Sequence, residues 1–140
     1  ANAIKPLLES SALVTVSGGG GIPVIEKNKG YQGVEAVIDK DFSAAKLAEL
    51  VDADELVIFT SVGDVFLNFG KPNQKALGVV PVSEMRQYLE EGYFAAGSMK
   101  PKVAAAVAFV ENTGKQATIT SLENVENFVK SGAGTRIVPD

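Results

Sequence analysis

Lysines at the start of two predicted helices are the residues best suited to chemistry in this chain. Asp39, Lys40 and Asp41 begin one helical pattern, and Lys100 and Lys102 lie in the first turn of another. The positive end of the helix dipole disfavours lysine at such positions, and local conflicts of this kind are expected at functional sites. A bound anion would resolve the conflict. Solvated surface charge is the alternative, and for Lys100 it is the preferred explanation.

These residue types favour phosphoryl transfer. That reaction depends mainly on positioned positive charge, so lysines, backbone amides and a metal ion suffice for it. Lys40 and Lys102 would meet across the sheet, while the Asp41 carboxylate could hold lysines or Mg²⁺. The chain contains no His and no Cys, which excludes catalytic triads, thiol nucleophiles and zinc hydrolases.

A run of glycines, Gly18–Gly21, follows the β-branched segment Ala12–Val16, which is typical of a buried strand. Consecutive backbone N–H groups in such a loop can cradle an anion. The run matches neither the dinucleotide-binding pattern nor the P-loop pattern. A flexible turn is therefore an equal alternative.

Aromatic residues in predicted loops could wall an adenine ring. They are Phe66, Phe69, Tyr93 and Phe94. Aromatic side chains beside a buried sheet more often serve as packing, so hydrophobic packing is the preferred explanation.

The hydrophobic pattern predicts strands that alternate with helices. Strands are expected at 12–16, 56–59, 117–120 and 135–138, helices at 41–51, 83–91, 102–113 and from 121 onward, and a hairpin within 24–37. Such alternation predicts an α/β fold with a mostly parallel sheet that is covered on both faces. Ligands bind beyond the carboxyl ends of strands in such sheets, which here are residues 17–21, 60–64 and Ser121.

Composition narrows the classes of partner. The 140 residues are 46% hydrophobic, and 13 basic against 17 acidic side chains give a net charge of −4. A single domain over residues 1–140 without a basic patch is expected to bind neither nucleic acid nor a membrane surface. Because no apolar run is long enough for a membrane helix and no leader is apparent, a cytoplasmic location is expected. The start at Ala-Asn-Ala, without Met, predicts a fragment.

Segments along the whole chain together resemble the carbamate kinases of the amino-acid kinase family. They are SGGGGIPVI (17–25), EAVIDKDFSAAKLAEL (35–50), NFGKPNQK (68–75), GSMKPKVAAAVAFVE (97–111) and ITSLENVENF (119–128). The resemblance implies an open three-layer α/β sandwich with a mostly parallel central sheet. It also implies the reaction ADP + carbamoyl phosphate to ATP + carbamate, which in fermentative catabolism runs toward ATP. A complete carbamate kinase is much longer, and the match covers only its carboxyl-terminal, nucleotide-binding half.

The resemblance also implies roles for individual residues. Lys40 would contact the transferring phosphoryl group, Asp41 would orient the catalytic lysines, and Lys102 would stabilise charge on the phosphoryl oxygens. The adenine nucleotide, ADP or ATP with Mg²⁺, would contact Lys40, Thr60, Ser61, Asp64, Val65, Met99 and Lys102. Gly18, Gly19 and Gly20 would form part of the floor toward the substrate half. No side chain is predicted to ligate a metal directly.

The chain departs from the family pattern in three respects. Gly63 stands where the family has Asp, with Asp64 as a potential substitute, and Ala96 stands where the family has Pro. The amino-terminal half of the family is missing, and it would supply a Gly-Gly-Asn loop, a third lysine, most contacts to carbamoyl phosphate and most of a homodimer interface. The chain alone is therefore expected to bind adenine nucleotide weakly and to lack turnover.

Two other functions stay open at this point. One is a different amino-acid kinase, which would act on an acylated amino acid or a nucleoside monophosphate; the segments SGGGGIPVI and NFGKPNQK argue against it. The other is a non-catalytic nucleotide-binding or interaction module that kept the fold and lost the reaction.

Overall fold

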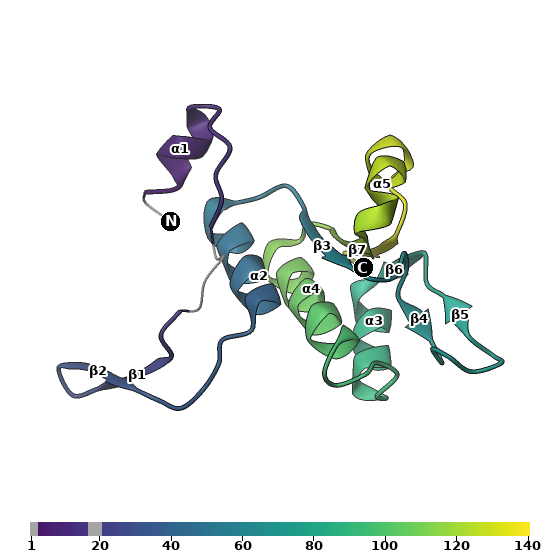
Figure 1. Cartoon of the computed structure of the whole chain (residues 1–140), viewed down its shortest axis with the longest axis horizontal. Helices are drawn as coiled ribbons and strands as arrows, with labels where there is room; N and C mark the ends of the chain where they lie inside the picture. The colour runs from purple at the N-terminus through teal and green to yellow at the C-terminus, as the bar shows by residue number, and fades with distance from the viewer. Residues whose placement is uncertain (1–2, 17–20) are drawn as a thin grey trace.

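The structure, a computed structural model, describes residues 3–16 and 21–140. Its elements run in the order α1 (Lys5–Glu9), β1 (Val24–Lys27), β2 (Gly30–Gly33), α2 (Lys40–Val51), β3 (Leu56–Thr60), β4 (Phe66–Leu67), β5 (Lys75–Ala76), β6 (Val79–Pro81), α3 (Val82–Glu90), α4 (Met99–Thr113), β7 (Ala117–Ser121), η1 (Leu122–Asn124), α5 (Val125–Ser131) and β8 (Thr135–Val138) (Figure 1). None of the helices in these ranges is both long and apolar enough to cross a membrane.

A four-stranded sheet in the order β3-β7-β8-β6 forms the centre of the fold. β3 pairs with β7 in parallel and β6 pairs with β8 in parallel, whereas β7 and β8 run antiparallel. The β-branched residues of β7 suit a strand that is buried along its whole length. The mainly parallel sheet confirms the predicted fold class, with one antiparallel pairing inside it.

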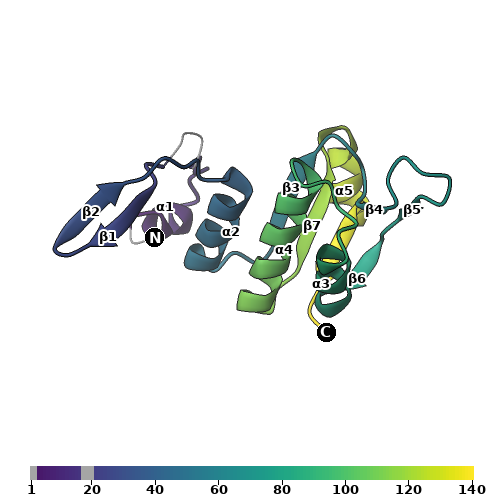
Figure 2. The ribbon, with the colours of Figure 1, turned by 90° about the horizontal axis from the view of Figure 1, so that it is seen from below.

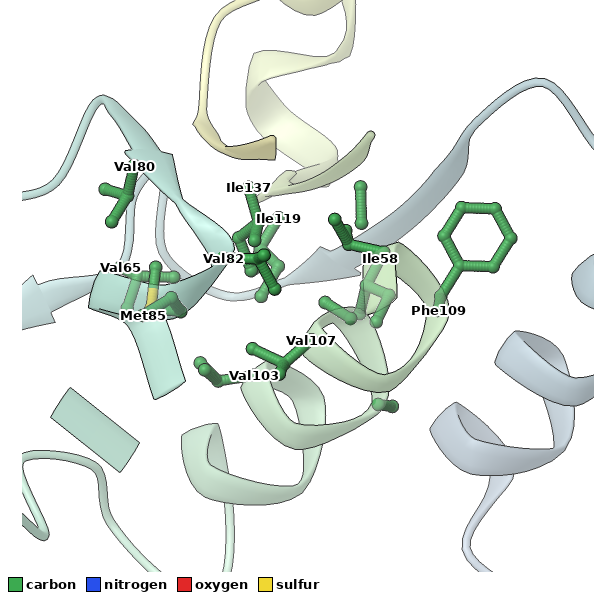
Figure 3. Close-up of a cluster of buried hydrophobic side chains, with 14 of the residues drawn as sticks. Ile58, Val65, Val80, Val82, Met85, Val103, Val107, Phe109, Ile119 and Ile137 are labelled. Carbon is green, nitrogen blue, oxygen red and sulfur yellow. The ribbon is translucent and has the colours of Figure 1, made fainter. Parts of the chain in front are cut away.

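Helices cover both faces of this sheet. α4 packs on β3, β7 and β8, with α2 and α3 beside it, whereas α5 packs on β7 from the other face (Figures 1 and 2). On the α4 side, Val103 and Val107 lie near Ile58 and Ile119 (Figure 3). On the α5 side, the ring of Phe128 meets that of Phe59 edge to face, with the centroids 6.3 Å apart. The three layers agree with the predicted sandwich.

The predicted helices are present, with adjusted starts. α4 begins at Met99 rather than at 102, because Pro101 falls in the first turn, where its missing N–H costs no helical hydrogen bond. The helix predicted at 83–91 is α3, and Ser83 does not cap it. The helix begins earlier, at Val82, and the Ser83 hydroxyl donates to Asp140 Oδ1 at 2.6 Å instead.

The predicted strand at Ala12–Val16 is also wrong. The segment is not a strand, and the side chain of Leu13 is 99% exposed. Its later residues, Val14 and Val16, instead line an open pocket together with Leu47 of α2. A β-branched segment becomes a strand only when a neighbouring strand accepts its backbone hydrogen bonds, and no strand of the described residues pairs with it.

Exposed apolar side chains gather in the first part of the chain, which lies to one side of the sheet (Figures 1 and 2). We call the exposed apolar residues of this part the amino-terminal apolar surface; they include Leu7, Leu8, Leu13, Val16, Ile22, Val24, Ile25, Ile38, Phe42 and Leu50. Apolar side chains exposed in such number are typical of a surface that contacts another polypeptide. In α2, Phe42 and Leu50 are each almost half exposed although they lie in a regular helix.

We expect the chain to self-associate through this surface, because association removes apolar area from water. Sedimentation velocity over a concentration series should show a growing dimer or oligomer fraction. The double variant Phe42→Ser and Leu50→Ser should weaken association by about tenfold or more. Leu122→Ser, which changes an exposed leucine on the far side of the fold, is the matched control. A clean monomer at high concentration would contradict this expectation.

Candidate active site

α2 and α4 lie side by side and point in the same direction. Near their starts, Lys102 Nζ donates to Asp41 Oδ2 at 2.9 Å, and near their ends Asn112 Nδ2 donates to Glu49 Oε2 at 3.2 Å. The N-termini of both helices, which carry positive partial charge, therefore converge at one place. Lys40 and Lys102 were expected to meet across the sheet, but they lie on α2 and α4, which pack side by side in one helical layer.

Further along, Lys115 fixes the end of α2. Its ammonium donates to Asp52 Oδ1 at 2.7 Å and to the carbonyl oxygen of Ala53 at 2.9 Å. The hydrogen bond from Lys115 lowers the pKa of the Asp52 carboxyl. α2 is thus attached to the α4–β7 region at both of its ends.

Asp39 and Asp41 have different structural roles at the start of α2, one as a helix cap and the other in an ion pair. Asp39 caps the helix, since its Oδ1 accepts from the backbone N–H groups of Asp41 at 2.8 Å and Phe42 at 3.3 Å. Because Asp39 satisfies these backbone donors, the side chain of Asp41 can turn toward α4 and pair with Lys102. This explains why acidic residues are denser here than a helix cap requires.

The Asp41–Lys102 pair is partly buried, with 23% of each side chain exposed. A lysine ammonium has three donors, and one of those on Lys102 is used by Asp41, so the others can bind an anion. Lys40, the first residue of α2, is exposed and takes part in none of the ion pairs between described residues. The site therefore offers ammonium groups beside two helix N-termini.

A cavity of about 150 Å³ lies beside the start of α4. It is lined by Thr60, Ser61, Val62, Phe66, Phe69, Tyr93, Phe94, Ala95, Ser98 and Met99. Thr60 and Ser61 come at the carboxyl end of β3, where ligands bind in sheets of this type. The walls are mostly apolar and aromatic, as expected for a site that takes a flat ring.

The aromatic residues of the predicted loops converge on this cavity. The rings of Phe66 and Phe69 pack with centroids 5.8 Å apart. Tyr93 is 37% exposed and is held edge to face by Tyr88, at 5.6 Å between centroids. The Tyr88 hydroxyl donates to Glu84, and this hydrogen bond raises the pKa of Tyr88. Tyr93 thus presents an exposed ring on a fixed support.

Met99 and Lys102 join the cavity to the ion pair. They are three residues apart on α4, and side chains at this spacing are neighbours on one helix face. Met99 lines the cavity, and Lys102 pairs with Asp41 one turn further along. A ligand whose flat ring occupies the cavity could therefore place an attached anionic group beside the lysines.

Other predicted site residues have different positions. Asp64 does not line this cavity, and the side chain of Val65 is fully buried in the core. Gly18, Gly19 and Gly20 lie outside the described residues. A side chain at Gly63 would have space, since a Cβ there would meet only Asn124 Nδ2 at 4.0 Å.

Sequence reasoning missed several lining residues. Ala95 and Ser98 belong to the cavity wall, as does Val62, which lies within the segment 60–64 where ligand binding was expected. Ser98 could have been found, because it directly precedes the first helical residue, Met99. Ala95 carries no chemical signal in the sequence.

The residues present do not form a Mg²⁺ site by themselves. No group of three Asp or Glu side chains in the described ranges is placed to hold a metal ion, and the Asp41 carboxylate already accepts from Lys102. Mg²⁺ in proteins is commonly held by one or two carboxylates together with substrate phosphates. Any Mg²⁺ here would therefore need oxygen ligands from a phosphate or from water in addition to the carboxylates of the described residues.

Known proteins are similar to this chain in sequence and in fold. The model of the amino acid kinase family matches residues 1–121. Carbamate kinase 2 of Enterococcus faecalis is 53% identical over 136 residues, which cover 96% of this chain and 43% of the relative. The carbamate kinase of Thermoplasma acidophilum is 49% identical over 135 residues, which cover 96% of this chain and 44% of the relative.

A solved structure is also similar to this chain, in fold as well as in sequence. The carbamate kinase from Giardia lamblia bound to AMP-PNP matches with a TM-score of 0.90 and 42% identity, over 99% of this chain and 49% of that chain. The chain thus spans less than half the length of these relatives.

Proposed function

Because this chain belongs to the amino acid kinase family, we propose that it forms the nucleotide-binding part of a phosphotransferase of the carbamate kinase type. The observation that carries the proposal is the Met99–Lys102 turn of α4, which joins an aromatic cavity to a lysine beside two helix N-termini. The adenine nucleotide would span both parts.

The adenine base would occupy the aromatic cavity. At about 150 Å³ the cavity is smaller than the roughly 300–1,000 Å³ of sites that enclose a whole drug-sized ligand. It suits a single ring system, with the ribose and phosphates outside it. The rings of Phe66, Phe69 and Tyr93 would supply apolar contact, and the AMP-PNP bound to the Giardia enzyme supports a nucleotide as the ligand of this fold.

The phosphates would extend toward the N-termini of α2 and α4. Lys102 and Lys40 would stabilise negative charge on the transferring phosphoryl group, which is the main requirement of this reaction. Asp41 would hold the Lys102 ammonium in place through the 2.9 Å hydrogen bond. Asp41 is a positioning residue in this scheme, whereas the two lysines are the catalytic residues.

The proposed reaction uses ADP and carbamoyl phosphate. A β-phosphate oxygen of ADP attacks the phosphorus atom, the bond from phosphorus to the carbamoyl oxygen breaks, and ATP and carbamate leave. Identities of 53% and 49% to carbamate kinases favour this substrate over those of other amino-acid kinases. In the longer protein, the remaining half would supply contacts to carbamoyl phosphate and a homodimer interface.

For the chain by itself, we propose nucleotide binding without turnover. This second function is favoured by the 43% to 49% of each relative that the chain covers. Formation of ATP by the purified chain from ADP and carbamoyl phosphate would contradict it.

Calorimetric titration with Mg·ADP tests nucleotide binding. We expect the chain to bind, and Tyr93→Ala to weaken binding by about 1–3 kcal/mol, the usual contribution of an aromatic ring that stacks on a base. Tyr93→Phe, which keeps the ring, should bind like the original chain. Tyr31→Ala, at an exposed tyrosine of β2, is the matched control. No heat of binding, or equal affinity for Tyr93→Ala, would refute the proposed site.

A further inference from the structure

One buried hydroxyl connects the aromatic wall of the cavity to the central sheet. Thr135 is the first residue of β8, and its side chain is fully buried. Its Oγ1 accepts from the backbone N–H of Val65 at 2.8 Å and donates to the carbonyl oxygen of Leu77. The backbone N–H of Leu77 in turn donates to the carbonyl oxygen of Val65, at 2.8 Å. These three bonds close a small network inside the core.

The network holds both ends of a protruding hairpin. Val65 directly precedes β4 and Leu77 directly follows β5, and these two short strands project beyond the sheet (Figures 1 and 2). The hairpin has its own ladder of only two residue pairs. Because so short a ladder is weak, the orientation of the hairpin depends on how its two ends are fixed.

The same hairpin carries the cavity aromatics Phe66 and Phe69. Phe66 is the residue after Val65, and Phe69 packs against it. Both residues line the cavity together with residues that precede and begin α4. A shift at Val65 would therefore move the ring of Phe66 first.

We infer that Thr135 is a positioning residue that sets the affinity of the cavity for the adenine base. The inference rests on the proposed nucleotide function. Thr135 does not line the cavity. It acts through Val65 and Leu77, by holding the hairpin in the orientation that brings Phe66 and Phe69 to the cavity wall.

Threonine suits this position because its hydroxyl both donates and accepts. Valine has nearly the same shape but can do neither, so Thr135→Val leaves the N–H of Val65 and the carbonyl of Leu77 without their partner. Serine keeps the hydroxyl and should preserve the network.

Thr120 provides a matched control within the same sheet. It lies in β7 and is fully buried, like Thr135. Its Oγ1 has no hydrogen-bond partner among the described residues. Thr120→Val therefore makes the same chemical change in a buried strand without removing a hydrogen bond.

The test compares two ligands, Mg·ADP and inorganic tripolyphosphate, by calorimetric titration of the chain and its Thr135→Val, Thr135→Ser and Thr120→Val variants. Thr135→Val should lower ADP affinity by about tenfold, as expected when a buried hydrogen-bond network is broken, and leave tripolyphosphate affinity unchanged. Thr135→Ser and Thr120→Val should retain the original ADP affinity. Amide hydrogen exchange at Val65 should become faster only in Thr135→Val.

Each other outcome has a definite meaning. The positioning role of Thr135 would be overturned if Thr135→Val bound ADP as tightly as the original chain. It would also be overturned if this variant lost the same factor of affinity for ADP and for tripolyphosphate. If Thr135→Val does not fold, Phe69→Ala decides, because Phe69 is 64% exposed and its loss should not disturb folding; unchanged ADP affinity there would overturn the inference. If the original chain binds tripolyphosphate but no ADP, the proposed adenine site itself is wrong, and the inference fails with it.

Discussion

Replacing Lys102 with methionine in a full-length protein that contains this sequence should lower kcat by about 10²–10³-fold, the usual effect of removing one group that stabilises transition-state charge. Lys102 is held by Asp41 at the joint N-termini of α2 and α4, where the phosphoryl group is proposed to transfer. Because its ammonium is needed mainly in the transition state, the KM for ADP should change much less than kcat. Steady-state kinetics with ADP and carbamoyl phosphate would measure both.

Lys100→Met is the matched control for this prediction. Lys100 lies in the same first turn of α4 but is exposed and forms no ion pair with the described residues. Its substitution should leave kcat nearly unchanged. If Lys102→Met changes only nucleotide affinity, the protein is a binding module rather than a phosphotransferase.

Replacing Gly134 with alanine should destabilise the fold by about 3–5 kcal/mol, through backbone strain and overpacking together. Gly134 has a φ of +127°, which residues with a Cβ rarely adopt. An added Cβ would also lie 2.7 Å from Thr120 Cβ and 2.8 Å from the carbonyl oxygen of Ile119. Since both neighbours belong to β7, an interior strand of the sheet, they cannot move away at low cost. Urea unfolding followed by circular dichroism would measure the loss.

Gly132→Ala is the variant that separates the cost of backbone strain from the cost of overpacking. Gly132 ends α5 with a φ of +69°, but an added Cβ would come no closer than 3.8 Å, to the flexible end of Arg136. Its substitution should cost only the backbone strain, about 1–2 kcal/mol. Equal losses in both variants would show that the contact with β7 does not matter.

Local patterns were enough to predict most of the elements. The apolar spacing of α2 and the nearly continuous apolar surface of α4 are properties of single segments, and the structure agrees with both. The segment Ala12–Val16 has an equally clear strand pattern, yet it forms no strand, because strand formation depends on a neighbour and not on the segment alone. The antiparallel pairing of β7 with β8 also had no local signal.

The residues of the candidate site also fall into those that could be predicted from the sequence and those that could not. Lysines that oppose a helix dipole are visible in the sequence, so Lys40 and Lys102 could be selected before the fold was known. Asp41 meets Lys102 because α2 packs beside α4. The residue types suggested only that Asp41 could hold a lysine, and the family resemblance gave it that role toward the catalytic lysines. Thr135 could not be selected at all. Its partners lie 70 and 58 positions away in the chain, and an isolated threonine in a strand is ordinary.

α2 has two roles that cannot be separated. Its first turn carries Asp41, which pairs with Lys102, and its flank carries Phe42 and Leu50 of the amino-terminal apolar surface. A polypeptide that covers this surface and favours the arrangement of α2 needed for phosphate binding would raise the affinity for nucleotide. Bound nucleotide would then raise the affinity for that polypeptide by the same factor, because coupling between two binding sites is reciprocal. Nucleotide binding and coverage of the amino-terminal apolar surface would then be linked through one helix.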